Sequence, residues 1–139
     1  MLPTMFGCAQ QGSSSPLAVS ITTPSDLGIP VPPGQNGATS NAGEISSTAT
    51  ASGGDGSYTY AWTLSEITDL DNGFAVASQG TTTTQTYNTG TVSTNYNNPL
   101  PPTPPPPPPA TATYRVSCTV TDGNGDTANA TADFNVSVV

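Results

Sequence analysis

The most informative absence in this 139-residue chain is that of basic side chains. It has no histidine and no lysine, and Arg115 is its single cationic residue against nine acidic ones. Without histidine, neither a Ser-His-Asp nor a Cys-His catalytic arrangement can form within the chain. We therefore predict that the protein is not an enzyme, and we expect no catalytic residue and no cofactor.

The formal net charge of -8 excludes two further classes of partner. Proteins that bind nucleic acid neutralise phosphates with several Lys or Arg side chains, which this chain lacks. Anionic membrane surfaces attract clusters of basic residues for the same reason. We therefore expect no nucleic acid and no membrane among the partners.

Cysteine and long apolar runs are also scarce. The two cysteines, Cys8 and Cys118, are too few for a structural zinc site in a chain without histidine. Cys118 is expected to be a small core residue, and a disulfide to Cys8 is the alternative. No run reaches transmembrane length, and residues 1–16 lack the basic and apolar regions of a signal peptide.

What the chain does contain favours strands and turns. Fourteen glycines and fifteen prolines accompany many Ser, Thr and Asn residues, and the length suits one domain. The clearest strand covers residues 58–64, where Tyr58, Tyr60, Trp62 and Leu64 alternate onto one face. Trp62 is the natural centre of a core.

A second strong pattern closes the chain. Residues 113–121 alternate apolar and polar side chains, and residues 128–138 do so again. The stretch Asp122–Asp126 between them is rich in Gly and Asn, which accept the backbone angles of a hairpin turn. The sequence therefore predicts a C-terminal β-hairpin.

Weaker alternation predicts further strands at residues 17–23, 44–52, 74–78 and 82–87. Residues 24–43, rich in Pro and Gly, are expected to connect two of them. The whole is predicted to be an all-β antiparallel sandwich of about seven strands over residues 17–139. In its expected core, Trp62 is buried against Val116, Cys118, Val120 and Phe134, and Tyr60 is a further core residue.

Two segments together resemble a PKD-type domain, which is an immunoglobulin-like sandwich. They are GGDGSYTYAW at residues 53–62 and YRVSCTVTDGNGDT at residues 114–127, within a resemblance that covers about residues 44–138. The resemblance implies a non-enzymatic module. Such domains occur on bacterial surface proteins, in secreted hydrolases and on tailed-phage particles.

Two unusual segments flank or interrupt the predicted sandwich. Residues 1–16 read as an extended N-terminal arm, with a disordered terminus as the alternative. Residues 88–110 read as a Pro-rich loop, in which six consecutive prolines form a polyproline II rod. Large apolar side chains and stiff prolines in these segments are the interface candidates: Leu2, Met5, Phe6, Tyr96, Leu100, Pro104 and Pro106.

One short pattern could ligate calcium. Asp122, Asn124 and Asp126 have the alternating oxygen spacing that begins a calcium loop, but no Glu follows at the position that completes it. A plain hairpin turn is the better interpretation, so we expect no metal. Arg115 is expected to pair with an acidic side chain across the sheet or at a subunit interface.

The function hypothesis that follows is a phage virion surface protein, either a capsid decoration (cement) protein or a tail accessory protein. It would attach to other virion proteins through the arm and the Pro-rich loop, with homo-oligomers as a further expectation. The alternative is an adhesion or carbohydrate-binding module on a bacterial surface or in a secreted protein, with host-surface glycans as partners. The hypothesis places the protein on the virion surface, and the alternative on the cell surface or outside the cell.

Overall fold

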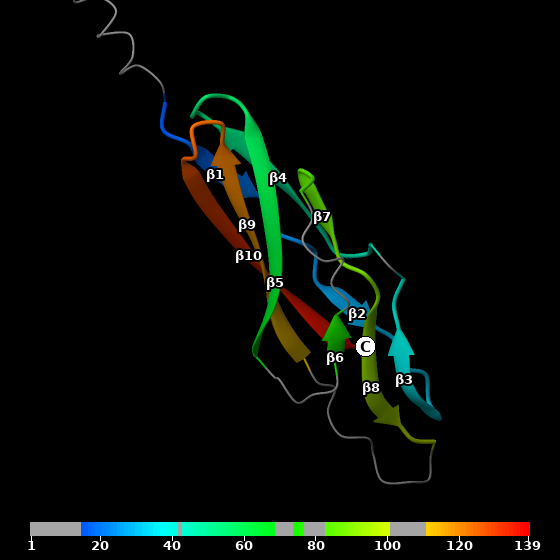
Figure 1. The fold of residues 1–139 in the computed structure, drawn as a ribbon. Coiled ribbons are helices and arrows are strands. Elements are labelled where there is room, and N and C mark those ends of the chain that lie inside the picture. The colour runs from blue at the N-terminus through cyan, green and yellow to red at the C-terminus, as the bar shows by residue number, and fades with distance from the viewer. Residues whose placement is uncertain (1–14, 42, 69–73, 77–82, 101–110) are drawn as a thin grey trace, which may run out of the picture.

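A computed structural model describes residues 15–41, 43–68, 74–76, 83–100 and 111–139 (Figure 1). These residues form strands and turns, and no helix among them could span a membrane. The all-β prediction is confirmed. The strands are β1 (Ala18–Ile21), β2 (Leu27–Ile29), β3 (Gln35–Thr39), β4 (Ser46–Ser52), β5 (Tyr58–Thr68), β6 (Phe74–Val76), β7 (Thr86–Asn88), β8 (Val92–Asn98), β9 (Thr111–Asp122) and β10 (Thr127–Val138).

The strands form three sheets. A four-stranded sheet has the order β2-β10-β9-β5, and two three-stranded sheets have the orders β1-β4-β7 and β3-β8-β6. Buried side chains of β4 and β7 pack on one half of the four-stranded sheet. Buried Val92 of β8 and partly buried side chains of β3 and β6 pack on the other half. Figure 1 shows the resulting elongated body, with β1 and β4 near one end and β3 and β8 near the other. This layering is that of a β-sandwich.

The longest strands follow the alternation that the sequence predicts. β5 and β9 pair antiparallel with Trp62 opposite Cys118, and β9 pairs with β10 as a hairpin. Along β9, the residues from Ala112 to Val120 with even numbers are buried, and those between them are half-buried. The predicted strands at 58–64, 113–121 and 128–138 are therefore confirmed, and all three extend further than predicted.

One part of the core surrounds Trp62. Its ring stacks on Tyr87 of β7 with centroids 5.6 Å apart, and its Nε1–H donates to the Thr84 carbonyl at 2.8 Å. The indole ring is thus buried in contact with another ring, and its polar N–H has a hydrogen-bond acceptor away from water. The predicted neighbours Val116, Cys118 and Val120 complete this cluster, and Tyr60 is half-buried at its margin.

A second part of the core surrounds Phe134. This residue stacks on Tyr114 with centroids 5.7 Å apart, and it is buried with Ile29, Ile45, Val92 and Val136. The expectation that Phe134 contacts Trp62 is wrong. On β9, Tyr114 lies opposite Phe134, and Cys118 lies opposite Trp62. Tyr114 and Cys118 are four residues apart along the extended strand, which separates them by about 13 Å.

Two stretches predicted as connections contain strands, so those predictions are wrong. Residues 24–43 contain β2 and β3, and β2 pairs parallel with β10, so the four-stranded sheet is not purely antiparallel. Residues 88–110 contain β8, which is the central strand of its sheet. Buried Val92 and Thr94 show the alternation that would have revealed β8, but its Asn and Thr content concealed it. The polyproline prediction lies outside the described residues.

Candidate functional site

Two acidic turns meet at one end of the sandwich. Asp55 in the β4–β5 turn accepts hydrogen bonds at Oδ1 from the N–H of Ser57 (2.9 Å) and of Gly123 (3.0 Å). Asp122 at the end of β9 accepts at Oδ1 from the N–H of Asn124 (3.0 Å) and of Asp126 (2.9 Å), and at Oδ2 from the N–H of Asp55 (3.2 Å). Each carboxylate therefore accepts hydrogen bonds from the backbone of its own turn and from that of the other turn. We call this arrangement the Asp55–Asp122 turn pair.

Glycine makes the approach of these carboxylates sterically possible. A Cβ at Gly54, where φ is +61°, would overlap the Asp122 carboxylate, and a Cβ at Gly123 would overlap that of Asp55. The N–H of Gly54 also donates to the Ser15 carbonyl at 2.9 Å. The first described residue of the chain is thereby fixed to the same end of the molecule.

The turn pair includes one of the calcium candidates, Asp122. The Asp122 side chain is buried, and backbone N–H donors engage both of its oxygens, while Asn124 and Asp126 are exposed. Within the described ranges, no three acidic or Cys side chains gather in a way that could hold a metal ion. The hydrogen bonds of Ser57 and then Gly123 lower the pKa of Asp55, which keeps that carboxylate charged as an acceptor.

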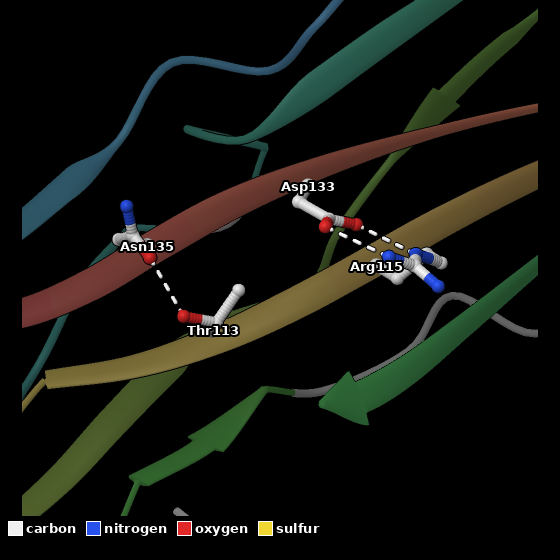
Figure 2. Close-up of polar contacts among 4 residues, drawn as sticks. All are labelled: Thr113, Arg115, Asp133 and Asn135. Atoms are coloured by element: carbon white, nitrogen blue, oxygen red, sulfur yellow. Dashed lines mark hydrogen bonds and ion pairs between the residues drawn. The ribbon is translucent and has the colours of Figure 1, made fainter. Parts of the chain in front are cut away.

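The outer face of the β9–β10 hairpin carries the single cation (Figure 2). Arg115 Nε and Nη2 donate to the two carboxylate oxygens of Asp133 at 2.7 and 2.9 Å, in a bidentate pair across the strands. The hydrogen bond and charge of Asp133 raise the pKa of Arg115, and the hydrogen bond to Arg115 lowers the pKa of Asp133. The prediction that Arg115 pairs across the sheet is confirmed.

Around this ion pair, the outer face consists of small polar side chains that bond to one another. Thr113 Oγ1 donates to Asn135 Oδ1 at 2.8 Å (Figure 2), and the Asn135 N–H donates to Asp26 at 2.8 Å. Asn129 Nδ2 donates to Thr119 Oγ1 at 2.9 Å. The face therefore offers hydroxyl and amide groups, without a large apolar or aromatic anchor.

The interface candidates fall into two groups. Leu2, Met5, Phe6, Pro104 and Pro106 lie outside the described residues. Tyr96 is half-buried within β8, which makes it a poorer contact residue than the loop prediction implied. Leu100 is 59% exposed, and its side chain lies directly over Gly34.

A small cavity of about 250 Å³ opens between β2, β3 and the residues that follow β3. Ile29, Pro30 and Ala38 give it an apolar side, and Glu44 and Asn41 give it a polar one. Asn41 Nδ2 donates to Glu44 Oε1 at 3.1 Å, which orients the carboxylate. The remaining lining residues are Gly28, Thr39 and Ser40.

Comparisons with known protein families, with curated proteins and with solved structures find no match to this chain. The immunoglobulin-like resemblance therefore rests on the two segments quoted above.

Proposed function

We propose that this protein is a non-enzymatic module of a phage virion surface, in capsid decoration or as a tail accessory. It attaches to other virion proteins through residues 1–16 and through the Pro-rich segment that begins near Leu100. We further propose that its sandwich is immunoglobulin-like. The layered sheets and the C-terminal hairpin support this assignment.

The observation that carries the proposal is the scarcity of anchors on the described surface. Interface anchors are usually aromatic or large apolar side chains and Arg. Across the described parts of the chain, the exposed large hydrophobic residues are Ile67, Leu100 and Val139, and Arg115 is already paired with Asp133. A tight contact therefore needs side chains from the N-terminal segment and from the Pro-rich segment. Leu100 lies at the start of the Pro-rich segment.

The attachment points of these two segments are far apart. Ser15 is bonded beside the β4–β5 turn, at the end of the body that holds the Asp55–Asp122 turn pair. β8 runs toward the opposite end, where β9 begins (Figure 1), and Leu100 lies two residues after β8 in the sequence. The twelve residues of β9 separate the two ends by about 36 Å. Two segments so placed suit a protein that spans neighbouring subunits.

A rebinding experiment tests the proposal. Particles lacking the protein are mixed with recombinant full-length protein, and the bound fraction is measured after sedimentation. Leu100→Ser and the double variant Met5→Ser/Phe6→Ser should each bind at least about tenfold more weakly, as expected when an anchor is lost. Ile67→Ser is the matched control, because it removes an exposed apolar side chain elsewhere, and it should bind as the parent does.

Circular dichroism should be the same for all of these proteins. If both test variants rebind as well as the parent, the contact lies on the sheet faces. If the parent itself does not rebind, the virion assignment is wrong.

The cavity beside Glu44 favours a second candidate function, carbohydrate binding by a surface or secreted module. A carboxylate and an amide that converge beside an apolar wall can accept and donate hydrogen bonds to a sugar while its C–H face packs on Pro30. A glycan array distinguishes carbohydrate binding from the virion function. Binding that is lost in Glu44→Gln and kept in Glu66→Gln, a control carboxylate on β5, would support the module.

A further inference from the structure

The edges of the three sheets are not alike. Six strands form these edges, and five of them have three to five residues: β1, β7, β2, β3 and β6. β3 is further broken by an irregularity between Asn36 and Ala38. Short and irregular edge strands are a common means by which proteins avoid pairing with other chains.

β5 is the exception. It has 11 residues, and its hydrogen-bonded neighbour is β9 on one side, while no described strand pairs with its other side. From Tyr58 to Ser65 it has no charged residue, no Pro and no Gly, and its register stays regular as far as Glu66. Figure 1 shows β5 along the margin of the four-stranded sheet. Within the described part of the chain, this stretch therefore lacks the charge, the Pro and the bulge that often protect an edge.

We propose that the free edge of β5 pairs antiparallel with β5 of a second copy of this chain, across a two-fold axis. Identical strands are complementary to each other in this arrangement, because each backbone donor meets the acceptor of its symmetry mate. The two four-stranded sheets then become one continuous eight-stranded sheet.

Charge does not oppose a like partner at this edge, despite the net charge of -8. The stretch that pairs carries no charge between Tyr58 and Ser65, so no like charges face one another there. Its exposed side chains are Thr59, Ala61, Thr63 and Ser65, which are small enough for a neighbouring strand to approach. Most of the acidic residues lie on other elements, where salt screens them over about 8 Å.

Glu66 selects the register. With the two-fold axis at Trp62, Ala61 faces Thr63 of the second copy, Thr59 faces Ser65, and Glu66 faces Tyr58. An axis at Glu66 would instead place two carboxylates opposite each other, which is destabilising. The axis at Trp62 also uses the full uncharged stretch, so it is the register that we assign.

This dimer is small, because edge pairing buries less surface than a standard protein interface, and we expect a dissociation constant in the micromolar range. It is independent of the virion assignment, since it is measured on the isolated protein. Its failure would leave the rebinding experiment untouched.

Sedimentation equilibrium of the full-length protein, under reducing conditions that prevent disulfides of Cys8, tests the proposal. The parent should fit a monomer–dimer equilibrium. In Ala61→Lys/Thr63→Lys, four ammonium groups meet at the axis of the dimer, and the dissociation constant should rise at least tenfold, or about 1.4 kcal/mol.

Asn129→Lys/Thr131→Lys is the matched control. It adds the same charge to the same face on β10, about 10 Å from β5, and should dimerise as the parent does. Circular dichroism and thermal melting confirm that both variants are folded. A monomeric parent at millimolar concentration, or an unchanged dissociation constant in a folded Ala61→Lys/Thr63→Lys variant, would overturn the proposal.

A third variant tests whether the partner of the β5 edge is β5 of the second copy or the N-terminal arm of the second copy. Met5→Ser/Phe6→Ser should dimerise normally if β5 pairs with β5. Loss of the dimer in this variant alone would assign the edge to the arm instead and overturn the two-fold pairing.

Discussion

Asp55 and Asp122 are separated by 67 residues in the sequence, yet each side chain accepts a hydrogen bond from the backbone of the other's turn. The β4–β5 turn crosses between the two layers of the sandwich, and the β9–β10 turn joins neighbours within one layer. The pair therefore ties the end of one layer to the end of the other. Five consequences of the structure can be measured.

Loss of the Asp122 side chain should destabilise the domain. Asp122→Ala leaves three backbone N–H groups without their acceptor in a site where the side chain is 5% exposed. We expect the free energy of unfolding to fall by about 2–3 kcal/mol in urea titrations. Asp126→Ala is the control, because this exposed side chain holds no turn, and it should be nearly neutral. Equal losses in the two variants would contradict the role of the turn pair.

Calcium should not stabilise the protein. A cation at Asp122 would have to displace the backbone N–H groups from which the carboxylate oxygens already accept hydrogen bonds. A ligand that binds only the native state raises the melting temperature. Melts with excess calcium and with chelator should therefore coincide. A clear rise in calcium that disappears in Asp122→Ala would show that the turn ligates metal after all.

Replacement of Trp62 should be the most damaging single change in the half of the core that it shares with Tyr87. The side chain is 1% exposed, and Trp62→Ala should cost about 3–5 kcal/mol. Trp62→Phe keeps a stacked ring and loses only the Nε1–H hydrogen bond to Thr84, so it should cost less than Trp62→Ala. Native fluorescence should be blue-shifted and move to longer wavelength on unfolding. Emission like that of free tryptophan in the native protein would disprove the burial.

The Cys118 thiol should be inert until the protein unfolds. Burial raises the pKa of Cys118 from 9.0 to about 11, so the reactive thiolate is suppressed at neutral pH. In a Cys8→Ser background, a thiol reagent should label the native protein only at the rate of unfolding, and denaturant should expose one thiol at once. Fast labelling of the native protein would contradict this.

The same shift gives a pH dependence of stability. Because the folded pKa is the higher one, the neutral thiol stabilises the fold fully below pH 9. This contribution is lost as the pH rises toward about 11, where the unfolded state has already released its proton. Cys118→Ala should flatten that part of the alkaline stability curve relative to the parent.

Local chemistry determined the elements with strong periodicity. The Tyr-Trp alternation of β5, the β9–β10 hairpin with its Gly/Asn turn, and the burial of Trp62, Val116, Cys118 and Val120 all follow from a period of two and from turn residues. The sequence also predicted an acidic partner for Arg115, which is the single cation of the chain. The sequence could specify these features because neighbours in the chain dictate them.

Tertiary structure decided what depends on distant neighbours. β2 becomes a strand because β10 offers it a parallel edge, and β8 becomes one because β3 and β6 flank it, although Pro or Asn weakens the local signal of each. The partition of the core between Trp62 and Phe134 follows from the register of β9, and the meeting of Asp55 with Asp122 follows from the packing of two turns. The free edge of β5 is of the same kind, since a strand's pattern does not reveal which of its sides lacks a neighbour.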